Sequence, residues 1–168
     1  MQYLELVYDD LPLSVNRIHE VKWFHVAGKR RAEIGYTKEA QNWMRRFQDR
    51  VGREFMRDIT RFVKQDRPTD LYEVIVVLHI SPERFLNKTW LKTGTSKAKA
   101  PYKPNDAPNY GKVLYDAVSS TLGRIDDTRF ADTDTVKLVS SREMVEVTII
   151  RRDPRDFGVP PEYLLETS

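Results

Sequence analysis

The run Leu71–Ile80 limits the possible folds more than any other part of the chain. It reads LYEVIVVLHI, with apolar and β-branched residues at both odd and even positions. Strands with nearly continuous apolar sequences are usually buried on both faces of a sheet. We therefore predict a central strand here, with His79 as a hydrogen-bonded core residue and not a catalyst.

Residues 106–123 have the spacing of an amphipathic helix. Asp106 can cap its N-terminus, Pro108 suits the first turn, and Gly123 can end it. Apolar residues recur at steps of three and four, which predicts a buried stripe of Tyr110, Val113, Leu114, Ala117, Val118, Thr121 and Leu122. Polar residues fall on a different face, and these are Asn109, Lys112 and Asp116.

A longer helix is predicted from Thr37, which can cap it, to about Lys64. Its expected core stripe is Ala40, Met44, Phe47, Val51, Phe55, Ile59 and Phe62. Basic residues form a second stripe, namely Arg46, Arg50, Arg53, Arg57, Arg61 and Lys64. Acidic residues on the same helix would partly neutralise the basic stripe, so we favour a solvated face over a phosphate track.

Three more strands are predicted, at Tyr3–Tyr8, Asp132–Val139 and Met144–Ile150, and the last two are expected to form a hairpin. The order is then β-α-β-α-β-β. We expect an α+β fold in which two helices pack on a mixed sheet. The run Leu71–Ile80, the helix after it and the next strand would form a crossover unit. The expected boundaries are a single domain over residues 1–152 and a C-terminal tail over residues 153–168.

Two segments lack helical or strand periodicity. Pro12–Tyr36 is predicted to be a long loop, and its basic cluster Lys29–Arg31 suits either phosphate contact or a solvated loop tip. The second segment is Pro82–Asn105. Every charged residue in it from Arg84 to Lys103 is basic, and aromatic residues such as Trp90 lie between them. Lysines contact phosphates and aromatic rings stack on unpaired bases, so this segment is a predicted DNA-binding loop.

Composition narrows the functional classes further. The chain has 28 basic and 25 acidic residues and no cysteine, which excludes disulfides, thiolate zinc sites and cysteine nucleophiles. No apolar run approaches membrane-spanning length, and the N-terminus MQYLELVYDD lacks the basic region of a signal peptide. We therefore expect no membrane association and a cytoplasmic location.

The order of polar motifs resembles the RusA family of Holliday-junction resolvases. The family signature is Asp-x-Asp-Asn-x-x-Lys, then Asp-Ala-Leu, then a second acidic pair. The chain has Asp106, Asn109 and Lys112, then Asp116-Ala117-Val118, then Asp126-Asp127, with Pro108 where the family has its second aspartate. The segments PLSVNR at 12–17 and GYTKEA at 35–40 are also similar to family motifs.

The resemblance implies a Mg²⁺-dependent endodeoxyribonuclease, with Mn²⁺ as an alternative metal, that resolves four-way junctions or other branched DNA as a homodimer. It implies a nucleoid-associated or phage-encoded protein. By resemblance, Asp106, Lys112 and Asp127 are catalytic, and Asp106, Asp127 and Asp126 are metal ligands. Expected DNA contacts are Arg17, Lys88, Lys92, Lys97, Lys99, Lys103 and Asn109.

Other interpretations of the same residues stay open. Asp106 could be only a helix cap, Lys112 and Asp116 only a surface ion pair, and Asp126-Asp127 only a polar turn. Because Pro108 replaces a carboxylate, a junction-binding protein with a weakened or inactive site is the alternative function. A protein that binds single-stranded DNA or RNA in general is a third and less favoured interpretation. Asp126, Asp132 and Asp134 are the nearest acids that could replace the missing ligand.

Overall fold

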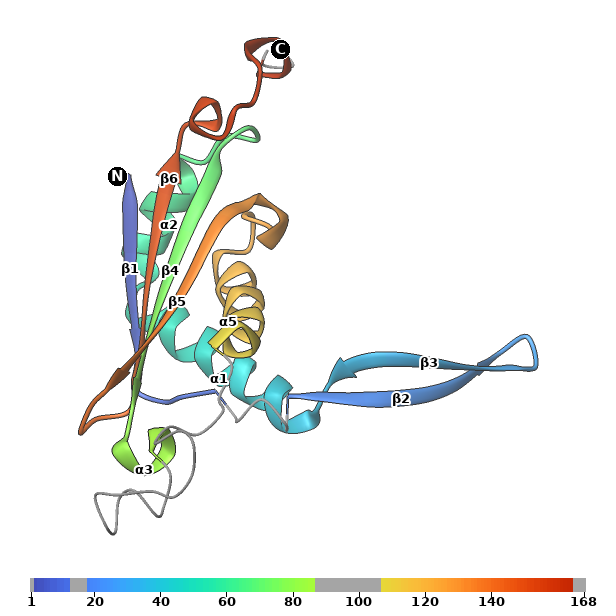
Figure 1. Cartoon of the computed structure of the whole chain (residues 1–168). Coiled ribbons are helices and arrows are strands. Elements are labelled where there is room, and N and C mark those ends of the chain that lie inside the picture. The colour runs from blue at the N-terminus through green and yellow to red at the C-terminus, as the bar shows by residue number, and fades with distance from the viewer. Residues whose placement is uncertain (1, 13–17, 87–106, 165–168) are drawn as a thin grey trace.

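A computed structural model of the chain describes residues 2–12, 18–86 and 107–164. Four strands form the main sheet in the order β1-β6-β4-β5, with the bounds β1 (Tyr3–Tyr8), β4 (Leu71–Ile80), β5 (Phe130–Val139) and β6 (Met144–Arg152). Helices α1 (Lys38–Glu54), α2 (Met56–Lys64) and α5 (Ala107–Leu122) pack against one face of this sheet (Figure 1). The predicted α+β fold with a mixed sheet is confirmed.

The sheet is mixed because β4 has partners of both orientations. β5 runs parallel to β4, and β6 runs antiparallel to both β4 and β1. The parallel pair is connected through α5, so the predicted crossover unit is confirmed. The apolar stripe of α5 is buried almost as predicted, and Gly123 ends the helix with a φ of 70°.

The predicted hairpin between the last two strands is wrong. β5 and β6 are not paired with each other, because β4 lies between them. Their connection passes around the end of β4, where Ser140 N–H donates to the Ile80 carbonyl at 3.0 Å. Glu143 accepts a hydrogen bond of 2.6 Å from the Ser81 hydroxyl, which fixes the same connection. Strong β propensity along Leu71–Ile80 places β4 in the centre, where it takes both neighbours as partners.

Along β4, buried residues alternate with half-buried ones, so only one face of the strand is fully buried. Tyr72, Val74, Val76, Leu78 and Ile80 are buried beneath the helices, while the alternate residues from Leu71 to His79 are only half-buried. We call the face opposite the helices the outer face. His79 lies on it, 3.2 Å from the Glu146 carboxylate, so the prediction of a core histidine is wrong. Glu73 and His79 interrupt the apolar character of this side of the strand.

The predicted long helix is divided at Phe55 into α1 and α2. Thr37 caps α1 as predicted, its hydroxyl accepting from Ala40 N–H at 3.2 Å. Trp43 is 1% exposed and is a core residue that the predicted stripe omitted, whereas Met44 is only half-buried. The break lets Ile59 and Phe62 of α2 remain on the core side.

The predicted loop Pro12–Tyr36 is wrong for the part that the structure describes. It contains an antiparallel hairpin of β2 (His19–Val26) and β3 (Lys29–Tyr36), which projects away from the main sheet (Figure 1). Ala27 and Gly28 form its two-residue turn, with φ values of 50° and 76°. Two successive positive φ angles are typical of hairpin turns that match strand twist.

Short elements complete the described chain. α3 (Pro82–Phe85) follows β4, and the 3₁₀ turn η2 (Asp127–Arg129) precedes β5. After β6 come η3 (Pro154–Phe157) and η4 (Pro161–Tyr163). Within the described ranges, no helix has the length and apolar character needed to cross a membrane.

Candidate active site

Two carboxylates from different elements meet at one end of the crossover unit. Asp116 is half-buried on α5, and Asp127 is the first residue of η2. Partial desolvation, followed by the negative charges of Asp116 and Asp126, raises the pKa of Asp127. Two carboxylates held this close repel each other, and a hard divalent cation with oxygen ligands would relieve that repulsion.

Tyr36 joins this acidic pair from the base of the β2–β3 hairpin. Its hydroxyl donates a hydrogen bond to Asp116 Oδ2, and its ring stacks on His19 with centroids 5.1 Å apart. Burial, the hydrogen bond to Asp116 and the charge of Asp127 raise the pKa of Tyr36, so the hydroxyl keeps its proton. Tyr36 was noted only as part of the GYTKEA segment, and its position directly before a helix cap was the available signal.

Asp126 has a role within the turn. Its carboxylate caps η2 by accepting from Thr128 N–H at 3.0 Å. Hydrogen bonds from the Thr128 side chain and backbone lower the pKa of Asp126. The adjacent residues Asp126 and Asp127 therefore differ: the first is occupied by the turn, and the second lies beside Asp116.

Arg129 anchors the turn that carries Asp127. Its guanidinium binds both Asp66 oxygens, at 3.0 Å and 2.6 Å, and its Nε donates to the Asp70 carbonyl at 2.9 Å. The Tyr72 hydroxyl donates to the same Asp66 carboxylate. No local sequence pattern predicts this network; the signal for it is an arginine two residues after the acidic pair Asp126-Asp127.

Lys112 lies one helical turn before Asp116 on α5 and is exposed. Among the ion pairs of the described residues, none joins Lys112 to Asp116, whose partner is the Tyr36 hydroxyl. The interpretation of these two residues as a surface ion pair is therefore wrong. The Lys112 ammonium stays available next to the acidic pair.

The other predicted site residues divide into two groups. The backbone of Asn109 lies in the first turn of α5. Outside the described residues lie Asp106, Arg17, Lys88, Lys92, Lys97, Lys99 and Lys103. Because Ala107 and Asp116 are nine residues apart on one helix, a rise of about 14 Å separates the helix start from the acidic pair.

Asp132 and Asp134 lie on the outer face, away from the acidic pair. Their register partners on β4 are Glu73 and Ile75, which point away from the helices. The next residue, Thr135, points to the opposite side of the strand, toward α5, where its hydroxyl forms a hydrogen bond of 2.8 Å with the Tyr115 hydroxyl. These two acids therefore cannot complete a ligand set with Asp116 and Asp127.

The acidic pair fits part of a Mg²⁺ site. Two aspartates supply the oxygen ligands that this ion prefers, and Mg²⁺ usually keeps several waters. Within the part of the chain that the structure describes, no group of three or more His, Cys, Asp or Glu residues could hold a metal. Asp116 and Asp127 could therefore supply only part of the ligand set of such an ion.

No protein-family model matches this sequence, and no curated protein matches it.

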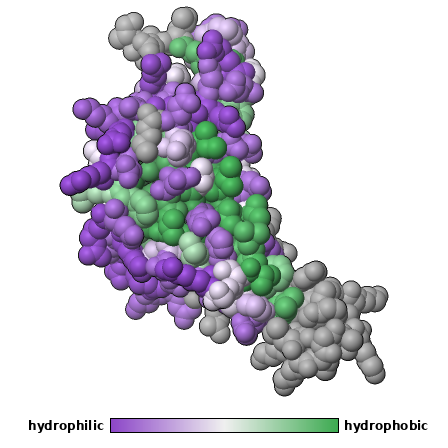
Figure 2. Space-filling view, turned by 90° about the vertical axis from the view of Figure 1, so that its left-hand side faces the viewer, coloured by the Kyte–Doolittle hydropathy of each residue, from purple (hydrophilic) through white to green (hydrophobic). Residues whose placement is uncertain are grey.

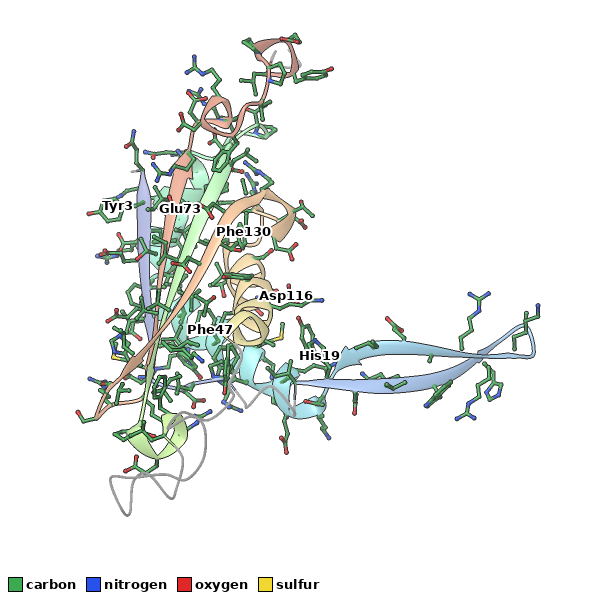
Figure 3. The ribbon with its side chains drawn as sticks, in the orientation of Figure 1. Tyr3, His19, Phe47, Glu73, Asp116 and Phe130 are labelled. Atoms are coloured by element: carbon green, nitrogen blue, oxygen red, sulfur yellow. The ribbon has the colours of Figure 1, made fainter. Side chains whose placement is uncertain are left out.

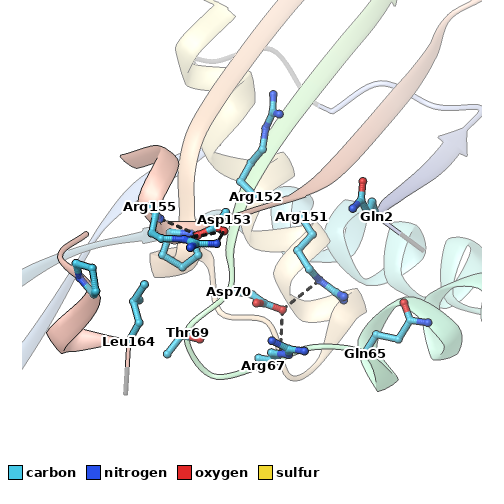
Figure 4. Close-up of a pocket in the computed structure, with 12 residues that line it drawn as sticks. Gln2, Gln65, Arg67, Thr69, Asp70, Arg151, Arg152, Asp153, Arg155 and Leu164 are labelled. Atoms are coloured by element: carbon cyan, nitrogen blue, oxygen red, sulfur yellow. Dashed lines mark hydrogen bonds and ion pairs between the residues drawn. The ribbon is translucent and has the colours of Figure 1, made fainter. Parts of the chain in front are cut away.

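A cleft of about 800 Å³ lies where the end of β6 meets the α2–β4 connection and the C-terminal turns (Figure 4). Three arginines in its wall are paired with carboxylates: Arg151 with Asp70 at 3.2 Å, Arg152 with Glu73, and Arg155 with Asp153. Most of the positive charge in the wall is therefore balanced, and Arg67 is a fourth arginine there, whose backbone N–H donates to Asp70 at 3.0 Å. Through Asp70 the cleft shares a wall with the Arg129 network.

Proposed function

We propose that the protein is a Mg²⁺-dependent endodeoxyribonuclease that cuts four-way junctions or similarly branched DNA. The observation that carries this proposal is the meeting of Asp116 and Asp127, with Lys112 one turn away on α5. The order of motifs along the chain, which resembles the RusA family, supports the same activity. Branched DNA as the substrate comes from that resemblance.

Each residue of the site has a definite task in phosphodiester hydrolysis. Bound Mg²⁺ would activate water and neutralise charge on the phosphate. Asp116 and Asp127 would hold the ion, and the resemblance adds Asp106 to them. Lys112 offers an ammonium to the scissile phosphate, and Tyr36 orients Asp116 through its hydroxyl hydrogen bond.

We further propose that the protein is a homodimer that associates through the outer face of the sheet. Figure 2 shows an apolar band across this face, to which the exposed side chains of Val7, Val136 and Leu138 belong. The half-buried Ile75 and Val77 extend the band on β4. A two-fold dimer presents two equivalent sites, as two symmetric cuts in a four-way junction require.

Carboxylates on the outer face favour a protein partner over DNA there. Glu73 and Glu146 have Arg152 and His79 as neighbours, whereas three other carboxylates have no ion pair among the described residues, and they are Glu5, Asp132 and Asp134. Carboxylates repel phosphate, so this face is unsuited to a nucleic-acid backbone. DNA would then approach from the side of α5 and the hairpin.

A junction-binding protein with an inactive site is the second candidate. Pro108, in the first turn of α5, takes the place of a family carboxylate, and the described residues supply only two clustered acids. Such a protein would bind branched DNA without cutting it.

Cleavage of an end-labelled four-way junction in Mg²⁺ tests both candidates. We expect nicking by the wild type in Mg²⁺ and none in EDTA. Asp127→Asn should reduce the single-turnover rate by at least about 100-fold while junction binding is retained, because the lost charge serves the metal and not the DNA. The matched control is Asp134→Asn on the outer face, which should cut normally. Binding without any cutting by the wild type would establish the inactive candidate.

A further inference from the structure

One face of the β2–β3 hairpin exposes a row of apolar side chains. Val21 is paired with Ile34, and Trp23 with Ala32, so all four point to the same side. The exposed fractions of Val21, Trp23 and Ile34 are 54%, 58% and 73%. Single exposed apolar residues need no explanation, but a contiguous row on a projecting ribbon indicates a binding surface.

The tip of the hairpin is basic. Lys29, Arg30 and Arg31 follow the turn directly, and no acidic residue occurs from position 21 to position 32. The Arg30 guanidinium lies 4.1 Å from the centre of the Trp23 ring, a cation–π contact on the same face as the apolar row. The tip thus presents cations together with an aromatic ring that has Arg30 over one face and is more than half exposed.

The same face of the hairpin leads to the acidic pair. His19 and Tyr36 are register partners at its base, and Tyr36 donates to Asp116. Figure 3 shows His19 at the base of the hairpin on the side where Asp116 lies. Arg30 and Tyr36 are six residues apart on one strand, about 20 Å, which matches the rise of about six base pairs of DNA.

We propose that this hairpin is a DNA-binding arm. Lys29, Arg30 and Arg31 contact backbone phosphates about 20 Å from the acidic pair, and Trp23 stacks on an unpaired base at the branch point. A two-stranded ribbon is narrow enough for the major groove, and stacking on aromatic rings is a common way to hold unpaired bases. This proposal rests on the proposed function for the identity of the ligand. It requires that the protein binds branched DNA but not that it cuts it.

A second copy of the chain is the other possible occupant. An arm that embraces a partner subunit would be expected to carry apolar residues to its tip, whereas this tip has three consecutive cations. Charge complementarity therefore favours a polyanion. The apolar band on the outer face, on a different part of the molecule, is already the proposed contact between subunits.

The test measures binding of the full chain to a fluorescent four-way junction and to a matched duplex in EDTA, at 50 to about 200 mM salt. One variant combines Lys29→Ala, Arg30→Ala and Arg31→Ala, and another is Trp23→Ala. The matched control removes three charges from the helices, with Arg53→Ala, Arg57→Ala and Arg61→Ala. Thermal denaturation of each protein checks that it folds.

We expect the tip variant to bind at least about 10-fold more weakly and its plot of log affinity against log salt to be shallower by about 2 to 3. Trp23→Ala should lose about 5- to 100-fold in junction affinity, lose less on duplex, and keep the wild-type salt slope. The helix control should bind with the affinity and slope of the wild type.

Three results would separate the DNA-binding arm from the proposed nuclease activity and from dimerisation. Wild-type affinity and slope in both hairpin variants would overturn the arm and leave cleavage at Asp127 unaffected. Loss of binding in these variants, with no cutting by the wild type in Mg²⁺, would retain the arm and overturn the nuclease. If the variants sediment as monomers where the wild type is a dimer, the arm binds a second copy and the DNA proposal is wrong.

Discussion

At the scale of single residues, Tyr36 controls how Asp116 faces Asp127. Its hydroxyl is the donor that fixes one Asp116 oxygen, and its ring is held by His19. Tyr36→Phe keeps the ring and removes only the hydrogen bond. We expect single-turnover cleavage to slow by about 10-fold at limiting Mg²⁺, with a loss of about 1 kcal/mol in unfolding free energy.

The control for this change is Tyr115→Phe on α5, which removes a hydrogen bond to Thr135 that involves neither Asp116 nor Asp127. It should have a similar effect on unfolding and little effect on the Mg²⁺ dependence of cleavage. Equal cleavage by Tyr36→Phe and wild type would show that Asp116 needs no such donor.

At the scale of elements, η2 is held by a nearly buried ion pair. The Arg129 and Asp66 side chains are only 17% and 12% exposed. Arg129→Met should lower the unfolding free energy by about 3 kcal/mol, because Asp66 would be left buried without a counter-charge. It should also reduce cleavage, since Asp127 lies two residues before Arg129.

Urea denaturation measures this effect, with Arg155→Met as the control for an exposed pair, which should change the unfolding free energy much less than Arg129→Met does. Adding Asp66→Asn to Arg129→Met should restore part of the lost stability. If the double variant is no more stable than Arg129→Met, the uncompensated charge is not the cause.

Sequence patterns identified the elements that bury one face and missed those that do not. The stripe of α5 and the strand β4 have apolar periodicity, so both were predicted with nearly correct bounds. Among the side chains that the structure describes, none between Lys22 and Glu33 of the β2–β3 hairpin is buried, and its strongest signal in the sequence is the Ala27-Gly28 turn. β4 was expected to be buried on both faces because Leu71, Ile75 and Val77 are apolar, although the structure leaves these side chains only half-buried.

The candidate site was predictable only in part for a similar reason. Asp127 and Lys112 stand out in the chain, since they belong to short polar motifs. Tyr36 and Asp116 are 80 residues apart, and Arg129 and Asp66 are 63 apart, so no local pattern links them. These contacts depend on how α1, α2 and α5 pack on the sheet.

At the scale of the whole molecule, the proposed dimer depends on the outer face of the sheet. Leu138→Glu should place a charge in the apolar band and weaken the dimer by at least about 10-fold, since an unpaired charge at an interface costs several kcal/mol. Sedimentation equilibrium at micromolar concentration measures the change. Met56→Glu, at a 58% exposed position on α2, is the control and should dimerise like the wild type. A wild type that is monomeric with and without junction DNA would contradict the dimer.

Stability should also fall in acid because of two paired carboxylates. Burial opposes ionisation of Asp66 and Glu143, but hydrogen bonds from Arg129 and Tyr72, and from Ser81 and Arg84, lower their pKa values. A carboxyl with a lowered folded pKa contributes stability above its unfolded pKa, about 4, and loses it as the pH falls through the folded value.

The melting temperature should therefore drop as the pH is lowered from about 5 to 3. Asp66→Asn should be less stable at neutral pH and should show a smaller drop, because one of the titrating groups is gone. Parallel pH profiles for the variant and the wild type would exclude Asp66 as a source of the acid sensitivity.

The pairing of β1 with β6 affects how the protein can be made. Tyr3 is opposite Ile150, so the first strand finds its partner only after residue 150 has been synthesised. At about 5–20 residues per second, the first strand waits on the order of 10–30 s with its apolar face uncovered. The edge of β4 that β6 will occupy stays open for the same reason. Chains that end before β6 would leave β1 and one edge of β4 unpaired, and we expect them to be substrates for chaperones or proteases.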